Sequence, residues 1–247
     1  MPDVLGYRGK WGVLVPSTNT VVEPDFYAMA PPGVTLHTSR IAIANPRMDD
    51  DAGFEALMLQ IRATIGRAVG EVLTAEPDYL IMGMSSETFW GGREGNEDFQ
   101  RRIAEQAAIP IATGANACDR AFAALGSRRL GVVTPYQPIG DAQVRRFFEE
   151  SGYQVAALCG LRCPTAVSIA HVEEATLRRA VAEVNRPDVD TIVQVGTNLS
   201  MLRLADAADR ELGKPVIAIN AATFWYALRA NGIEDRVPGF GRLLRDH

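Results

Sequence analysis

The fold is decided by the stretch DYLIMGMSSETF at residues 78–89, which has a counterpart in DTIVQVGTNLS at residues 190–200. Each begins with a strand-length run of mainly apolar residues and ends in a turn rich in hydroxyl and amide side chains. In parallel α/β folds, ligands bind at the carboxyl ends of the strands. The two stretches therefore predict a single site, formed where two similar halves of the chain face each other.

The chain repeats itself around these two stretches. An apolar strand opening at residues 11–16 returns at residues 130–135, and in both halves a polar turn and a helix-compatible stretch follow it. Both halves also close alike, with a short proline-led strand and then an alanine-rich helix that ends at Gly126 or Gly232. A repeat of roughly 110 residues is far longer than a solenoid unit and indicates duplicated domains.

Strands alternate with helical patterns in the order expected of parallel sheets. In residues 53–73, for example, apolar residues recur at the spacing of a helix that packs on a sheet. The predicted fold class is α/β, with two similar Rossmann-like domains, each a short parallel sheet flanked by helices, related by pseudo-two-fold symmetry. Strands are expected near residues 11–16, 34–43, 78–83, 109–113, 129–134, 153–159, 190–195 and 215–219.

The repeat also suggests where the domains divide. We expect residues 1–115, together with roughly 220–247, to form the first domain and residues 116–219 to form the second. The active site is expected in the cleft between them. Because no low-complexity linker separates the halves, they are expected to pack tightly.

Composition narrows the class of partner. The 247 residues carry a formal net charge of −5, which argues against a nucleic-acid partner because phosphate binding needs a basic face. The apolar stretches are of strand length, and the N-terminus lacks the basic region and apolar core of a signal peptide. We therefore expect no membrane partner and a cytoplasmic location, and a homo-oligomer stays open.

The cysteines predict neither a disulfide framework nor a metal site, because Cys118, Cys159 and Cys163 are few and odd in number. Cys159 and Cys163 have the spacing of a zinc half-site, but a tetrahedral zinc needs two more ligands. The histidines offer no pair at helical spacing to complete the site. Small buried thiols are the simpler interpretation.

Five motifs, taken in order, give the chain a family resemblance. They are VPSTNT at residues 15–20, MGMSSETFWGG at 82–92, TPY at 134–136, GTNL at 196–199 and PGFGRL at 238–243. Through them the chain resembles the maleate cis-trans isomerases and arylmalonate decarboxylases of the aspartate/glutamate racemase superfamily. The resemblance covers essentially the whole chain, and it implies an enzyme without cofactors that acts on a small carboxylic acid.

The chain departs from that family at its two cysteine positions. Isomerases and racemases of this type resemble one another in carrying one cysteine per half, at the positions that Met84 and Gly196 hold here, whereas the decarboxylases keep only the second. Neither Met84 nor Gly196 can exchange a proton or act as a nucleophile in place of a thiolate. Racemisation by two cysteines is therefore excluded.

What remains is a set of groups suited to binding an anion. The resemblance implies that these groups surround a substrate carboxylate, together with nearby backbone N–H groups. Donors aimed at oxygen also stabilise the charge of an enediolate, and one such donor typically contributes about 3 kcal/mol to the barrier. The alternative role of the hydroxyl and amide side chains is to cap the helices that follow. The predicted residues are Ser17 and Asn19 from the first strand-end loop, Ser85 and Ser86, Tyr136, and Thr197 and Asn198.

Glu87 is the predicted replacement for the missing thiol. It lies three positions after Met84 and two positions before the pair Phe89 and Trp90. Rings that exclude water would favour its protonated form and let it take or give a proton. The alternatives are a glutamate favoured by the helix dipole or one that points at solvent. His37 and His171 are weaker acid–base candidates.

Two further features bear on the substrate. In the loop at residues 164–167 the chain lacks the Asp-Asn pair of the isomerases it resembles, and Ala166 supplies no amide, as in the decarboxylases. Six aromatic residues suggest an apolar side pocket as a further hypothesis. The alternative is that they belong to the core, as most aromatic residues at such positions do. The six residues are Phe26, Tyr27, Phe89, Trp90, Phe224 and Trp225.

The sequence thus favours a cofactor-independent enzyme that acts next to a carboxylate, as a decarboxylase-type lyase that stabilises an enediolate. Glu87, Tyr136 and Ser85 are the predicted catalytic residues. One alternative is an isomerase or hydrolase that uses Ser85, or a water held by Glu87, as its nucleophile. The other is a catalytically silent relative that only binds carboxylates.

Overall fold

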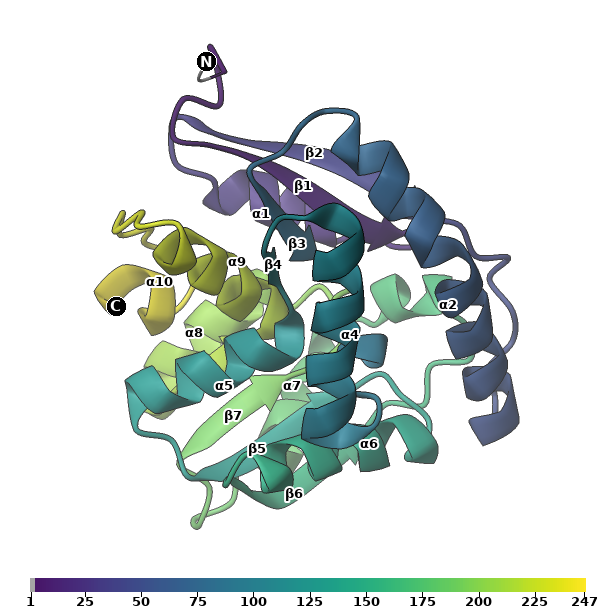
Figure 1. The fold of residues 1–247 in the computed structure, drawn as a ribbon. Helices are drawn as coiled ribbons and strands as arrows, with labels where there is room; N and C mark the ends of the chain where they lie inside the picture. The colour runs from purple at the N-terminus through teal and green to yellow at the C-terminus, as the bar shows by residue number, and fades with distance from the viewer. Residues whose placement is uncertain (1–2) are drawn as a thin grey trace.

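The protein contains two four-stranded parallel sheets of the same topology, as the computed structural model, which describes residues 3–247, shows (Figure 1). The strand orders are β2-β1-β3-β4 and β6-β5-β7-β8, so the second sheet repeats the first position by position. This confirms the predicted α/β class and the internal repeat. The strands are β1 (Gly9–Pro16), β2 (Val34–Ile41), β3 (Tyr79–Met82), β4 (Ile111–Ala112), β5 (Arg129–Thr134), β6 (Gln154–Gly160), β7 (Thr191–Gln194) and β8 (Val216–Ala218).

Helices cover the sheets, and the helix predicted in residues 53–73 is α2, which spans Asp51–Leu73. The long helix α2 begins at Asp51 because the side chain of Asp50 accepts a hydrogen bond from the backbone N–H of Gly53 at 2.8 Å. The helices are α1 (Val22–Met29), α2 (Asp51–Leu73), α3 (Ser86–Phe89), α4 (Gly92–Ala107), α5 (Gly114–Leu125), α6 (Pro138–Glu150), the 3-10 turn η1 (Val167–His171), α7 (Glu174–Val184), α8 (Leu202–Leu212), α9 (Ile219–Ala230) and α10 (Arg242–Asp246).

The central strands are the most deeply buried. Every residue of β3 and of β7 is buried, whereas the edge strands β2 and β6 are partly exposed. Strands covered by helices on both faces read as nearly continuous apolar runs, which is the pattern that the sequence shows at these positions. The carboxyl ends of β3 and β7 therefore form a rigid base for the turns that follow them.

Two helices are exchanged between the halves. Helix α5 follows β4 of the first sheet, yet its Phe122 packs against Phe148 of α6, with ring centroids 5.3 Å apart. Helix α9 follows β8 of the second sheet, yet its Phe224 packs against Trp11 of β1 at 5.9 Å. The two helices also pack against each other (Figure 1). These contacts support our proposal that the domains divide near residues 115 and 220, and they interlock the two halves.

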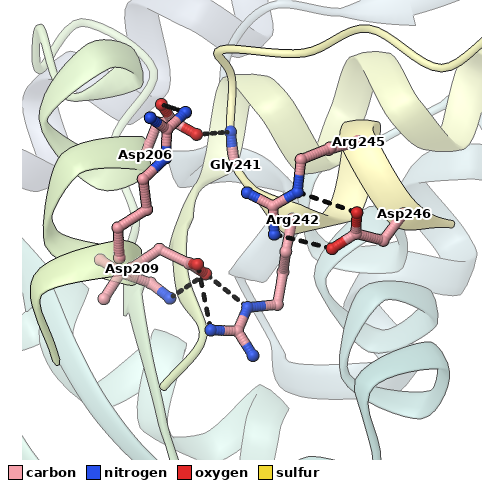
Figure 2. A network of polar contacts seen from close by, with 8 residues as sticks. Asp206, Asp209, Gly241, Arg242, Arg245 and Asp246 are labelled. Atoms are coloured by element: carbon pink, nitrogen blue, oxygen red, sulfur yellow. Dashed lines mark hydrogen bonds and ion pairs between the residues drawn. The ribbon is translucent and has the colours of Figure 1, made fainter. Parts of the chain in front are cut away.

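The C-terminal segment is fastened to α8 by two aspartates (Figure 2). Asp209, which is only 2% exposed, pairs with both Nε and a terminal nitrogen of Arg242, at 2.6 and 3.0 Å. Asp206 accepts a hydrogen bond from the backbone N–H of Gly241 at 2.9 Å. The PGFGRL motif is thus a docking segment that holds the end of the chain against the second half.

Removing the arginine of this pair is expected to destabilise the fold. An Arg242→Ala variant leaves the carboxylate of Asp209 buried without its charged partner, which is expected to lower the free energy of unfolding by about 3 kcal/mol. Urea denaturation monitored by circular dichroism measures the loss. The matched control is Arg245→Ala, because Arg245 pairs with the exposed Asp246 and is expected to cost less than about 1 kcal/mol. Equal losses in the two variants would contradict the role assigned to Asp209.

Candidate active site

A small cavity lies between the two halves, at the carboxyl ends of their central strands. Its volume is about 50 Å³, which is room for a few water molecules or the head of a small acid. Among the described residues, no charged side chain lines it. Its lining is Pro16, Thr18, Asn19, Ile43, Met48, Phe54, Leu57, Ile61, Met84, Ser85, Ser86, Tyr136, Ala166, Ile169, Gly196, Thr197 and Asn198.

The polar centre of the cavity is a pair of hydroxyls from opposite halves. The oxygen atoms of Ser85 and Tyr136 are 2.7 Å apart, and the backbone N–H of Thr197 donates to Ser85 Oγ at 3.3 Å. Burial raises the pKa of Tyr136, so its phenol stays protonated at neutral pH and acts as a hydrogen-bond donor. Because one hydrogen joins the two oxygens, the second hydroxyl hydrogen remains available for a ligand.

Thr197 joins the two halves directly. Its hydroxyl donates to the carbonyl oxygen of Gly83 at 3.0 Å and accepts from the side-chain amide of Asn19 at 3.2 Å. Its carbonyl oxygen accepts from the side chain of Asn220 at 3.0 Å. Since its N–H also bonds to Ser85, every polar group of Thr197 has a partner. Thr197 lines the cavity with both of its donors engaged, so we expect it to hold its neighbours in place, and its predicted contact with a substrate stays a prediction.

Asn198 and Asn19 are partly committed to similar contacts. Asn198 accepts from the backbone N–H of Thr20 at 3.0 Å and donates to the carbonyl oxygen of Ala166 at 2.9 Å. Asn19 accepts from the N–H groups of residues 21 and 22, which begin α1. Over residues 3–247, the backbone N–H groups of Ser86 and Asn198 have no hydrogen-bond acceptor. They are two of the free backbone donors that the strand-end turns supply.

Met84 and Gly196 occupy the two positions where the family resemblance places cysteines, and the local structure suits each of these residues. The sulfur of Met84 accepts from the backbone N–H of Glu87 at 3.3 Å and from the hydroxyl of Ser86 at 3.4 Å. Gly196 has a φ of +106°, and a Cβ atom there would lie 2.5 Å from a ring carbon of Pro135. A side chain at position 196 would therefore need the backbone to move.

The structure places two predicted site residues outside the cavity. The carboxylate of Glu87 is buried and pairs with Nε of Arg62 on α2 at 2.8 Å, and Glu87 does not line the cavity. It turns toward α2 because a buried carboxylate needs a charged partner, which the arginine provides. Ser17 is exposed, and its hydroxyl bonds to the backbone of Ile43, two residues after the end of β2. The expected acid–base role of Glu87 and binding role of Ser17 find no support in this geometry.

An apolar wall closes the other side of the cavity, and it differs from the predicted aromatic one. Of the six aromatic candidates none lines the cavity, and three of them, Phe26, Phe89 and Phe224, are fully buried in the core. The wall consists mainly of aliphatic residues. Its one aromatic ring, that of Phe54, packs against the ring of Tyr136, with the centroids 5.3 Å apart. The helical spacing of apolar residues in 53–73 was the sequence signal that could have indicated this wall, because it places Phe54, Leu57 and Ile61 on one face of α2. The members of the wall are Ile43, Met48, Phe54, Leu57, Ile61 and Ile169.

Asp25 lies behind the site and titrates near neutral pH. Burial raises its pKa to about 6, against a smaller opposing effect of the hydrogen bond from the side chain of Asn220. That hydrogen bond is 2.8 Å long, and the same amide nitrogen of Asn220 donates to Thr197. The side chain of Asn220 thus connects Asp25 to Thr197 in the turn that follows β7.

Comparisons with known proteins agree with this architecture. A family model described as arylmalonate decarboxylase matches residues 11–244. The chain is 27% identical to a maleate isomerase of Pseudomonas putida, over 94% of this chain and 96% of that protein. It is 29% identical to an arylmalonate decarboxylase of Bordetella bronchiseptica, over 66% and 69% of the two chains. A solved structure of a cysteine-to-serine mutant of the Nocardia farcinica maleate cis-trans isomerase, with a covalently bound succinylcysteine intermediate, superposes with a TM-score of 0.86 at 25% identity, covering 96% of this chain and 98% of that one.

The raised pKa of Asp25 predicts how stability changes with pH. Because the folded state holds the Asp25 proton more tightly than the unfolded chain, wild-type stability from this group falls as pH rises from about 4 to about 6, and stays low above that. An Asp25→Asn variant loses this dependence. In urea denaturation, its gain in stability relative to wild type is expected to be larger at pH 7.5 than at pH 4.5. An equal difference at both pH values would show that Asp25 does not bind its proton more tightly in the folded state.

Proposed function

The chain belongs to the arylmalonate decarboxylase family, and we propose that it is a cofactor-independent lyase that removes carbon dioxide from a small dicarboxylic acid. The observation that carries this proposal is the hydroxyl pair of Ser85 and Tyr136, set against an apolar wall in a cavity without charged side chains. A carboxylate that becomes an enediolate takes up the electron pair of the broken bond, so a second negative charge develops on its oxygens. Neutral donors aimed at those oxygens stabilise the charge as it develops.

One carboxylate of the substrate is expected to bind at the polar centre. Its oxygens can accept from the free hydroxyl hydrogen of the Ser85 and Tyr136 pair and from the backbone N–H groups of Ser86 and Asn198. These donors come from turns that follow β3 and β7 and from the turn after β5. Because the turns are fixed to buried strands, little reorganisation is needed when charge develops.

The second carboxylate is expected to face the apolar wall and to leave as carbon dioxide. The bond between that carboxyl carbon and the central carbon breaks, and its electron pair stays on the substrate as an enediolate. Aliphatic side chains such as Leu57 and Ile61 offer no hydrogen bond to a carboxylate but accommodate neutral carbon dioxide. The wall also suits an apolar substituent on the central carbon.

The enediolate must then receive one proton on carbon. We propose that the phenol of Tyr136 supplies it and regains a proton from water, because a phenol is a stronger acid than the serine and threonine hydroxyls that also line the cavity. Met84 and Gly196 have no proton to give. Glu87, the expected donor, points to Arg62 and is separated from the cavity.

The isomerase alternative is less well supported by the lining of the cavity. The Nocardia farcinica enzyme forms a succinylcysteine intermediate, so its substrate becomes bonded to a cysteine sulfur. Among the described lining residues of this cavity there is no cysteine, and Cys118 and Cys163 are buried elsewhere. A route through addition of a thiolate is therefore closed, whereas loss of carbon dioxide requires no nucleophile.

A substrate screen tests the proposal. Release of carbon dioxide from malonates with apolar substituents is the expected result, measured beside the conversion of maleate and beside calorimetric binding of the same acids. Conversion of maleate to fumarate would favour the isomerase alternative. Tight binding without turnover of any acid would favour a carboxylate-binding relative.

Replacing Tyr136 is expected to affect turnover far more than replacing Glu87. Tyr136→Phe removes the donor and the proton source while keeping the ring, so turnover of the best malonate is expected to fall by about a hundredfold or more. Glu87→Gln, the matched control, keeps shape outside the cavity and is expected to stay within a few-fold of wild type. A hundredfold loss in a folded Glu87→Gln protein would restore Glu87 as the proton donor.

A further inference from the structure

The backbone of Tyr136 is held from behind by an ion pair. A terminal nitrogen of Arg162, which follows β6, donates both to the carbonyl oxygen of Tyr136 and to the carboxylate of Asp141 on α6. The hydroxyl of Thr134 accepts from the backbone N–H of Tyr136 at 3.1 Å and donates to the same carboxylate. The carbonyl oxygen and the N–H of Tyr136 are therefore each connected to the carboxylate of Asp141 through one side chain, that of Arg162 or Thr134. The side chain of Asp141 is only 8% exposed.

The first half of the chain contains the same arrangement. Arg40, near the end of β2, donates to the carbonyl oxygen of Asn19 at 2.7 Å and pairs with Glu23 on α1. In each half an arginine from the second strand, or from the residues just after it, reaches the turn after the first strand. It then pairs with an acid on the next helix. Because the two sheets have the same topology, the two clamps occupy equivalent places behind the two site residues.

Local geometry around Arg162 indicates that this clamp is built rather than incidental. Arg162 has a φ of +54°, a left-handed conformation that is unfavourable for a residue with a side chain. Such strained residues persist where the surroundings over-determine them, and they gather at functional sites. In addition, a Cβ atom on Gly160 would lie 2.3 Å from the guanidinium of Arg162 and 2.3 Å from the carboxylate of Asp141. The absence of a side chain at position 160 is what leaves room for the pair.

We propose that Arg162 and Asp141 are positioning residues that fix the phenol of Tyr136 against Ser85, so that it meets the substrate at the correct place. The proposal rests on the function proposed above for the cavity, but its geometric part can be measured without any substrate. Neither residue lines the cavity, so both act through Tyr136. A purely structural ion pair would affect stability and leave the phenol where it is.

Gly160→Ala is the variant that tests the clamp most cleanly. The new methyl group meets the far ends of the side chains of Arg162 and Asp141, which can move aside, so the protein is expected to fold. The matched control is Gly70→Ala on α2, where an added Cβ atom meets nothing within 4 Å. Asp141→Asn provides a second way to weaken the clamp without adding volume.

Two measurements keep the clamp separate from the reaction. The first is the 19F NMR resonance of 3-fluorotyrosine at position 136, assigned by its loss in Tyr136→Phe. It is expected to shift or broaden in Gly160→Ala and Asp141→Asn and to stay unchanged in Gly70→Ala. The second is turnover of the best malonate, for which kcat is expected to fall by about tenfold or more with KM nearly unchanged, because small misplacements of a catalytic group are costly.

The outcomes distinguish the two proposals. An unchanged Tyr136 resonance in folded Gly160→Ala and Asp141→Asn overturns the clamp, whatever happens to turnover. A shifted resonance together with unchanged kcat also overturns it, because the displaced phenol would not matter to the reaction. A shifted resonance in a protein that turns over no acid at all supports the positioning role and refutes the proposed lyase.

Discussion

The hydrogen bond from the hydroxyl of Thr197 to the carbonyl oxygen of Gly83 joins the two halves at the point where the cavity lies. The two strand-end turns must meet for it to form, and they meet only if β3 and β7 are aligned end to end. The remaining polar groups of Thr197 extend the junction to Ser85, Asn19 and Asn220. Buried polar groups are costly when they are left unpaired, and every polar group of Thr197 is paired in this placement, so the junction favours one relative placement of the halves.

The exchanged helices α5 and α9 also hold the two halves together. Because α5 and α9 each pack on the half to which their preceding strand does not belong, the sheets cannot separate without exposing Phe122 and Phe224. Burial of such aromatic side chains contributes more to stability than a single hydrogen bond does. The apolar exchange therefore supplies most of the adhesion between the halves, and the Thr197 junction sets their register. A site made of groups from both halves needs both properties.

The sequence predicted the strands, the repeat and the meeting of the two turns, because each rests on periodicity or on residues at strand ends. Ser85, Ser86, Tyr136 and Thr197 do come together as expected. The direction of Glu87 was not predictable, since it depends on Arg62, which lies 25 residues earlier on another helix. The apolar wall was misassigned because large aromatic residues suit both a pocket and a core, and only the packing of α2 decides between them.

The distribution of charge bears on the chemistry. Ion pairs surround the cavity, at Arg62 with Glu87, Arg40 with Glu23 and Arg162 with Asp141, yet within the described residues no charged side chain lines it. A cationic side chain beside the leaving carboxylate would stabilise its charge before reaction more than in the transition state, where that charge is being lost, and stabilisation of this kind does not raise kcat. Neutral donors at one end and hydrocarbon at the other favour the state in which one carboxylate has lost its charge as carbon dioxide. The arginines instead hold the backbone behind the donors, where their charge fixes geometry without neutralising the group that must leave.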